Sequence, residues 1–469
     1  MVNSVKSFSF AALMALPALA GLTAAANADV TISTHATAHM NCSGGLCSPT
    51  AANAVLNVND LQTMLASSAV SVISTAQAPN IRVMAGFSWS SGNSLNIDSY
   101  RGIDIQKPIS VLSTAPVSFR INDGGSGGTF NVGAHASIHF LSTFSTLTIN
   151  GGSPYTLVND ISTLASDIAS NPGGNYALAA SYDAGPDGIY EFAPVATTFT
   201  GKFEGLGNTI SNLVIRHGNR KLGLFATIDT GASAENISLT RMNLHATGNT
   251  RSFGGGLAAV NNGTIFNAHT AGKISTTGTG GTGGALVGVN NGTIANSSSN
   301  ATPQNGTACV GGLVGINTGT ISQSFAQGTA FAAQAGGLAC ENSGTIANSY
   351  ELVSVGGRFT SPYPGGLVSV NDASGVLTTS YAAGQITAVE KFGGIAGTND
   401  GSLSQVYWDT DDTGAGNTFG CGAGSCSGAT PLTQLQLQSA LPSGFDPAIW
   451  GQAPGVNNGY PYLLNNPPR

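Results

Sequence analysis

An eleven-residue pattern of aliphatic, glycine and asparagine positions occurs six times between residues 251 and 408. The first copy runs from Gly255 to Ile265, and the later copies begin at Gly284, Gly311, Gly336, Gly365 and Gly393. Position three is always aliphatic: Leu257, Leu286, Leu313, Leu338, Leu367 and Ile395. Position eleven is also always aliphatic, once two inserted residues in the fifth copy are allowed for: Ile265, Ile294, Ile321, Ile346, Leu377 and Leu403. A fixed pattern at this spacing predicts stacked repeat units that bury two aliphatic columns.

Position seven is asparagine in every copy, and a glycine follows shortly after it. The asparagines are Asn261, Asn290, Asn317, Asn342, Asn371 and Asn399. Asparagine and glycine together favour a turn with positive φ, in which the amide satisfies backbone groups. Identical side chains in successive strands stack about 4.8 Å apart. We therefore predict that these six residues form a structural asparagine ladder.

Each repeat is predicted to contain two or three short strands separated by turns. A further position, four residues past position eleven, is biased toward aromatic residues: His269, Ser298, Phe325, Tyr350, Tyr381 and Tyr407. A helical hairpin would not tolerate so much glycine, which costs about 1 kcal/mol per residue relative to alanine. The predicted fold is an all-β, right-handed parallel β-helix with one coil per repeat, because parallel crossovers are right-handed.

The remaining chain is less regular. Apolar and polar residues alternate, as in strands, over 81–121 and 137–149. One helix is expected at 61–66, capped by Asn59 or Asp60, and another at 161–169, capped by Asn159 or Asp160. A third helix, opened by residues 430–432 and running to about Leu441, is expected to cap the open end of the solenoid. The predicted organisation is a signal peptide (1–28), an N-terminal β-helix region (29–200), transition coils (201–250), the repeat β-helix (251–408) and a C-terminal capping region (409–469).

The first 28 residues are typical of a cleaved secretory signal. Lys6 precedes an apolar stretch from about Phe8 to Leu22, and Ala26-Asn27-Ala28 fits the cleavage site. No later run of 18 uncharged apolar residues occurs, so a transmembrane helix is not expected. The sequence therefore predicts a secreted or cell-surface protein.

Composition narrows the possible functions. Only 8% of residues are charged while 41% are hydrophobic, and 65 are glycine. Disordered chains combine low hydrophobicity with high net charge, which does not describe this sequence. The formal net charge is −7 and the few basic residues form no stripe, which argues against nucleic-acid binding.

Six cysteines behind an export signal allow disulfide bonds. Cys42 lies five residues before Cys47, and Cys421 lies five residues before Cys426, so each pair is predicted to close a local loop. The pairing of Cys309 and Cys340 is left open. Neither local pair has the spacing of a zinc site.

Several segments resemble filamentous-haemagglutinin-like bacterial adhesins with GLUG-motif repeats. The GLUG motif is best matched by Gly312-Leu313-Val314-Gly315. Segments that also resemble this family lie at 199–213, 223–226, 406–410 and 459–463. The stretch from Asn59 through Trp89 to Ile105 resembles the body of filamentous-haemagglutinin adhesins. The resemblance implies a parallel β-helix, adhesion to a surface glycan or protein, and an outer-membrane secretion partner. The Asn-Pro-Asn-Leu type motif of two-partner adhesins does not occur in the chain.

Other motifs were weighed as candidate chemistry. The pairs His35/His39 and His135/His139 have zincin spacing but lack the glutamate general base, and we interpret them as polar strand positions. Ser126 lies in a Gly-x-Ser-x-Gly run without a following helix, so no nucleophile is predicted. The run Gly278–Gly283 is interpreted as a loop.

Two oxygen-rich turns could in principle hold calcium. Asp409–Gly414 begins like a calcium loop, but Gly420 stands where the bidentate glutamate belongs, and Asp183 and Asp187 form the second turn. Both are interpreted as ordinary turns, and no metal or cofactor is predicted.

Binding without catalysis is the predicted function, and a β-helix polysaccharide lyase or hydrolase is the alternative. That chemistry needs converging carboxylates and cations. The acidic residues of the repeats do not share a column: Glu341, Glu351, Asp372, Glu390 and Asp400. A structural or ice-binding wall is a third possibility, based on the column Thr264, Thr293, Thr320 and Thr345. Binding is expected along the solenoid wall and the loops Thr276–Gly283 and Arg358–Pro364.

Overall fold

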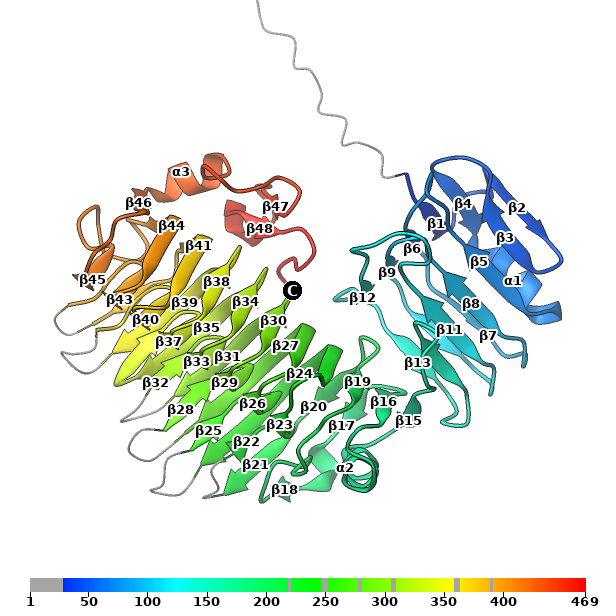
Figure 1. The fold of residues 1–469 in the computed structure, drawn as a ribbon, viewed down its shortest axis with the longest axis horizontal. Coiled ribbons are helices and arrows are strands. Elements are labelled where there is room, and N and C mark those ends of the chain that lie inside the picture. Colours follow the sequence, from blue (N-terminus) through cyan, green and yellow to red (C-terminus); the bar gives the residue numbers. More distant parts are fainter. Residues whose placement is uncertain are drawn as a thin grey trace, which may run out of the picture.

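The computed structural model describes residues 28–217, 221–246, 252–276, 281–304, 309–357, 363–388 and 391–469. Most of these residues form short strands that stack into a parallel β-solenoid (Figure 1). Figure 1 shows two stretches of solenoid joined at an angle, with the C-terminus between them. Within the described ranges no helix is long and apolar enough to cross a membrane. The predicted signal segment lies outside the described residues, apart from Ala28.

The N-terminal solenoid has three sheets. The first contains β4 (Ala54–Asn57), β1 (Val30–Ser33), β6 (Ile81–Val83), β9 (Ile103–Ile105) and β12 (Phe130–Val132). The second contains β7 (Phe87–Trp89), β10 (Ile109–Val111) and β13 (Ile138–Phe140). The third contains β2 (Met40–Ser43), β3 (Leu46–Pro49), β5 (Val70–Ile73), β8 (Leu95–Asp98), β11 (Val117–Arg120) and β14 (Leu147–Ile149).

Alternation along these short strands decides which side chains reach the core. In β6, Ile81 and Val83 are fully buried while Arg82 lies between them on the outer face. The strand β9 repeats this arrangement around Asp104, and the parallel register places Arg82 directly beside Asp104. The pattern therefore produces an aliphatic interior and a polar outer column on the same sheet.

The second solenoid is also built from three sheets. The longest has 19 strands and includes β19 (Lys202–Glu204), β24 (Ser233–Ala246), β27 (Thr264–Ser275), β30 (Thr293–Ala295), β31 (Ser298–Gln304), β34 (Thr320–Ser322), β35 (Phe325–Ala332), β38 (Thr345–Ala347), β39 (Tyr350–Gly357), β41 (Val376–Ala382), β44 (Ser402–Asp409) and β46 (Ala429–Leu432). An eight-stranded sheet contains β23 (Phe225–Ile228), β26 (Ala258–Asn261), β29 (Val287–Asn290), β33 (Val314–Asn317), β37 (Ala339–Asn342), β40 (Val368–Asn371), β43 (Ala396–Asn399) and β45 (Cys421–Gly424). A five-stranded sheet of β22 (Lys221–Leu222), β25 (Phe253–Gly254), β28 (Thr282–Gly284), β32 (Cys309–Gly311) and β36 (Gln334–Gly336) completes the coils.

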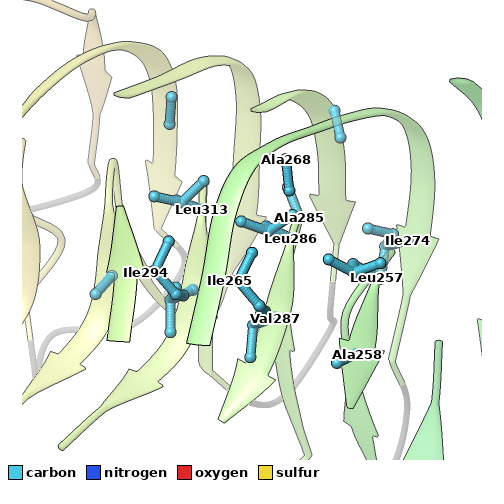
Figure 2. Close-up of a cluster of buried hydrophobic side chains, with 14 of the residues drawn as sticks. Leu257, Ala258, Ile265, Ala268, Ile274, Ala285, Leu286, Val287, Ile294 and Leu313 are labelled. Carbon is cyan, nitrogen blue, oxygen red and sulfur yellow. The ribbon is translucent and has the colours of Figure 1, made fainter. Parts of the chain in front are cut away.

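The two aliphatic columns of the repeat point into the core, as predicted. Leu257, Leu286 and Leu313 from position three are fully buried, and so are Ile265 and Ile294 from position eleven (Figure 2). Register pairs Ile265 with Ile294 in neighbouring coils. Equivalent residues therefore contact one another in every coil, which explains why the sequence repeats. The prediction of a parallel β-helix is confirmed.

Three short helices are present near the predicted places, with two corrections. Helix α1 (Val58–Ser67) is capped by Asn57 rather than Asn59 or Asp60, because the helix begins earlier than expected. Helix α2 (Ile161–Ser170) is capped by Asp160. Helix α3 (Gln434–Ser439) is shorter than predicted, because residues 429–432 pair as strand β46 and leave Thr433 to cap the helix.

The C-terminal region does more than extend the end of the solenoid. Strands β45 and β46 pair with the last repeat coil. The following chain then turns back and packs against the aromatic column of the repeats, where Trp450, Tyr460 and Leu463 are buried. The last residues run further back along the coils, so that Asn466 donates hydrogen bonds to the carbonyl oxygens of Ser297 (3.0 Å) and Gln323 (3.2 Å).

Candidate functional site

The six repeat asparagines form one continuous hydrogen-bonded ladder inside the second solenoid. Each side-chain Nδ2 donates to the Oδ1 of the next asparagine at 2.7–2.8 Å, and Asn399 donates to the carbonyl oxygen of Ser425. The side chains are 0–2% exposed. Each Nδ2 that donates within the ladder also lies near a turn carbonyl, such as that of Gly319 at 3.3 Å from Asn317. Because the ladder is buried and paired, it is structural rather than ligand-binding.

A second ladder, which sequence reasoning missed, is made by serines at the next corner of the coil. The backbone N–H groups of Ser297, Ser324 and Ser349 donate to the Oγ of the serine one coil further along, ending at Ser380, at 3.1–3.2 Å. The residue before each serine has a φ between 43° and 49°. In two of the four coils an asparagine precedes the serine, at Asn296 and Asn348, and this was the available signal because asparagine tolerates that conformation.

The aromatic positions stack on one another and are covered by the C-terminal region. The ring centroids of Phe325 and Tyr350 are 4.9 Å apart, those of Tyr350 and Tyr381 are 5.1 Å apart, and the rings are nearly parallel. The hydroxyl of Tyr381 donates to the carbonyl oxygen of Pro461 at 2.6 Å. Trp450 packs against Tyr350 and Tyr381 at 6.0 Å. These rings are therefore an internal packing element and do not offer a stacking surface to a ligand.

The outer faces of the second solenoid are mostly neutral. Thr264, Thr293 and Thr320 are exposed and lie side by side in the long sheet, and Thr345 continues the column half-buried. The eight-stranded sheet presents a half-buried column in the same register: Val260, Val289, Ile316, Glu341, Val370 and Thr398. These two columns are the regular wall that the repeat generates. Of the two loops predicted to contact ligand, residues 277–280 and 358–362 lie outside the described residues.

The structure separates the residues of the other candidate motifs. His35 and His39 both lie in bends and His135 lies in a turn, so the interpretation as strand positions is wrong for these three and holds only for His139 in β13. Ser126 is exposed in a bend. Among the described residues, no group of three or more histidine, cysteine or acidic side chains is placed to hold a metal ion.

Both oxygen-rich turns are occupied by donors from the protein itself. Asp409 accepts hydrogen bonds from the backbone of Asp411 and Asp412, and from the hydroxyl of Tyr460 at 2.6 Å. Asp183 accepts from Gly185 and Asn212. These carboxylates stabilise turns.

Disulfide bonds join all six cysteines. Cys42–Cys47 and Cys421–Cys426 close local loops, and Cys309–Cys340 links two neighbouring coils of the repeat. Both cysteines of this third pair are buried, Cys309 in β32 and Cys340 in β37.

Two glutamates, Glu204 and Glu351, are buried in the second solenoid. Burial, and next the adjacent carboxyl of Glu235, raise the pKa of Glu204 well above its ordinary value. Burial raises the pKa of Glu351 to about 8, although Val353 and Gly384 donate backbone hydrogen bonds to it. Both carboxyl groups are enclosed by the protein, and neither meets a cation at salt-bridge distance within the described part of the chain.

A polar cleft of about 710 Å³ lies where the N-terminal solenoid, the second solenoid and the C-terminal tail (464–469) meet. One wall is the outer face of β6, β9 and β12, and the facing wall includes Asn267, Asn296 and the tail. Hydrogen bonds fix this junction, since Asn267 donates to the carbonyl oxygen of Val132 at 2.8 Å. The tail is anchored by Arg469, whose guanidinium donates to Ser238 at 2.9 Å.

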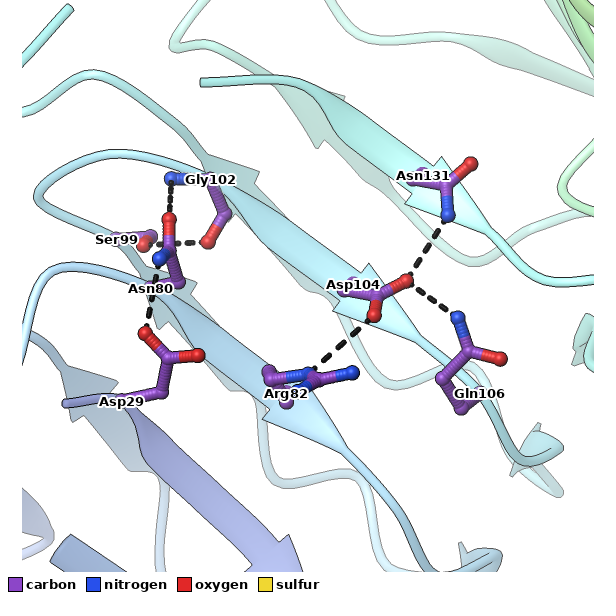
Figure 3. A network of polar contacts seen from close by, with 8 residues as sticks. All are labelled: Asp29, Asn80, Arg82, Ser99, Gly102, Asp104, Gln106 and Asn131. Atoms are coloured by element: carbon purple, nitrogen blue, oxygen red, sulfur yellow. Dashed lines mark hydrogen bonds and ion pairs between the residues drawn. The ribbon is translucent and has the colours of Figure 1, made fainter. Parts of the chain in front are cut away.

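Polar side chains on the first wall hold one another in place. The carboxylate of Asp104 accepts hydrogen bonds from Gln106 (2.7 Å) and Asn131 (2.9 Å) and lies 3.5 Å from the Nε of Arg82 (Figure 3). The side-chain oxygen of Asn131 is buried and has no hydrogen-bond partner. Sequence reasoning did not find this cleft, because its walls are about 130 residues or more apart along the chain.

A neighbouring part of the same wall is fixed by Asn80. Its amide donates to Asp29 at 2.8 Å and accepts from the backbone of Gly102 at 3.1 Å (Figure 3). Hydrogen bonds within the protein thus already fix Asn80, Gln106 and Asn131 on this wall of the cleft.

Comparison with known proteins gives little further guidance. No family profile matches the chain. Over 104 residues, 19% of the chain, it is 36% identical to halomucin of Haloquadratum walsbyi, and this stretch is 1% of halomucin's length. A crystal structure of a candidate immunoglobulin A1 protease from Bacteroides ovatus is similar with a TM-score of 0.45 and 17% identity, covering 66% of this chain and 93% of that one. At this distance the likeness says nothing about activity.

Proposed function

We propose that the chain is an exported cell-surface adhesin that binds ligands without catalysis. The observation that carries the proposal is the regular outer wall of the second solenoid, where Thr264, Thr293 and Thr320 stand exposed in adjacent coils. Solenoids use such extended surfaces to engage partners. The secretory pattern of residues 1–28 and the resemblance to filamentous-haemagglutinin-like adhesins support the same proposal.

The wall would bind through many weak contacts. A hydrogen bond from a threonine to a ligand mostly replaces one to water and contributes about 0.5–1.5 kcal/mol. Useful affinity then requires several coils or several copies of the protein on one surface. The ligand class proposed for the wall is a surface glycan or a protein of a host or neighbouring cell.

The enzymatic alternative is a β-helix polysaccharide lyase or hydrolase. General acid–base cleavage of a glycosidic bond needs two carboxyl groups that reach the substrate. Glu204 and Glu351 are buried, so neither of them can serve as one of these two groups.

The test compares protein displayed on beads with free monomer, using candidate cells and a glycan array. Adhesion predicts much stronger retention of the beads, with intact ligand recovered afterwards. Release of shortened oligosaccharide or cleaved peptide, abolished by a single substitution of an acidic residue or a serine, would establish an enzyme instead.

A further inference from the structure

We infer that the cleft between the two solenoids binds an anionic oligosaccharide. The inference rests on the proposed binding function and locates a specific site for it away from the neutral wall. Three features of the cleft carry it: its charge, its set of amide side chains, and the way those side chains are held.

The cleft is cationic in a protein that is acidic overall. Four basic side chains line it, against two acidic ones, whereas the whole chain has a formal net charge of −7. The basic residues are Arg82, Arg101, Lys107 and Arg469, and the acidic ones are Asp29 and Asp104. Arg82 already lies near Asp104. Arg101 and Lys107 are exposed and make no salt bridge with any described residue. A concave surface with an excess of positive charge attracts an anionic ligand.

The uncharged lining matches hydroxyl groups. Asn80, Gln106, Asn131, Asn296 and Asn465 line the cleft. An amide group carries two N–H donors, so a side chain that already donates to Asp29 or Asp104 keeps a second N–H. Sugars present neighbouring hydroxyls that both donate and accept.

Size and preorganisation fit a short oligosaccharide. A volume of about 710 Å³ lies within the usual range for ligand pockets, roughly 300–1,000 Å³. Asp104 orients Gln106 and Asn131 beforehand, so less side-chain freedom is lost on binding. Met84 and Leu464, which are 41% and 44% exposed, add small apolar surfaces at the cleft for the faces of sugar rings.

The central experiment measures binding by titration calorimetry with the complete protein. The probes are a tetramer of galacturonate, a neutral galactose tetramer, a sulfated galactose tetramer, a tetraglutamate peptide and inorganic phosphate. We expect the anionic saccharides to bind at least about tenfold more tightly than the neutral saccharide and the peptide. Comparison of the carboxylated and sulfated tetramers then identifies the acidic group.

A pair of matched variants locates the site. Arg101→Gln with Lys107→Gln removes two exposed cations from the cleft, whereas Arg216→Gln with Lys273→Gln removes two exposed cations outside its lining. Both changes shift the net charge equally. The cleft variant should lose about tenfold or more in affinity, while the control should stay within about twofold of the parent. Melting temperatures verify that both variants fold.

Several results would overturn the inference. Equal losses in the two variants would mean general charge attraction rather than a site. Tighter binding of the peptide, of phosphate, or of the neutral saccharide would mean that the ligand class is wrong.

The bead assay separates this inference from the proposed function. Retention on cells that is unchanged in the cleft variant would leave adhesion standing and refute the cleft as its site. Saccharide binding that depends on Arg101 and Lys107 without any retention on cells would support the cleft and refute adhesion.

Discussion

Replacement of Asn317 by alanine tests the asparagine ladder in the middle of the solenoid. The change removes the bond that Asn290 donates to Asn317 (2.8 Å) and the bond that Asn317 donates to Asn342 (2.7 Å). Asn290 keeps its turn carbonyl, Gly292, at 3.3 Å. The Oδ1 of Asn342 is left buried without a donor. An orphaned buried acceptor costs about 1–3 kcal/mol, and the lost bond adds roughly 1 kcal/mol, so a total of about 2–4 kcal/mol is expected.

The assay is unfolding in guanidinium chloride, followed by circular dichroism, with the midpoint and the slope compared between variants. Ser322→Ala is the matched control, because Ala295 and Ala347 occupy the same column in the neighbouring coils. It should change stability by no more than about 0.5 kcal/mol.

The end of the ladder provides a second comparison. Asn399→Ala orphans no ladder acceptor, since Asn399 donates to the carbonyl oxygen of exposed Ser425, which water can reach. Its cost should be only about 1 kcal/mol. Equal midpoints for Asn317→Ala and Ser322→Ala would refute the reasoning.

Three further predictions concern titration and the C-terminal region. The pKa of Glu351 is about 8 in the folded protein against 4.5 ordinarily, so the contribution of Glu351 to the free energy of unfolding is complete below pH 4.5 and falls by about 1.4 kcal/mol per pH unit as pH rises toward 8. Glu351→Gln should remove this slope in denaturation midpoints measured from pH 5 to 8. Burial, and then the charge of Arg469, lower the pKa of His269 from 6.5 to about 3, so the free energy of unfolding should fall by about 1.4 kcal/mol per pH unit as pH drops from 6.5 toward 3. In His269→Gln, the same denaturation midpoints should depend less on pH over this range. Trp450→Ala should destabilise the packing of the C-terminal region on the aromatic column by about 3–5 kcal/mol. Limited proteolysis should then cut the chain faster after residue 433, whereas Leu435→Ala, at an exposed position, should leave the cleavage rate unchanged.

Contacts that recur in every coil could be predicted from the sequence, whereas contacts made by a single segment could not. Leu286 and Asn290 each bond to an equivalent residue in the coils before and after, so the repeat spacing alone predicts their surroundings. The contacts of the C-terminal tail (464–469) occur only once in the fold. Asn466 bonds to Ser297, 169 residues earlier, and nothing in the local sequence around either residue indicates that contact. Helix α3 was misplaced for a related reason, since pairing of β46 with β44 overrode the local start signal at residues 430–432.

The two proposed binding regions differ in charge, so the salt dependence of binding distinguishes them. The threonine wall carries no charge along Thr264, Thr293 and Thr320, so its contacts should change little with ionic strength. The cleft depends on Arg101 and Lys107, both exposed, whose attraction for an anion is screened over about 8 Å at physiological salt. If cell retention survives high salt while saccharide binding weakens, the two regions serve different ligands. If both weaken together, and both require Arg101 and Lys107, the cleft is the adhesive site and the wall is the scaffold that holds it away from the cell.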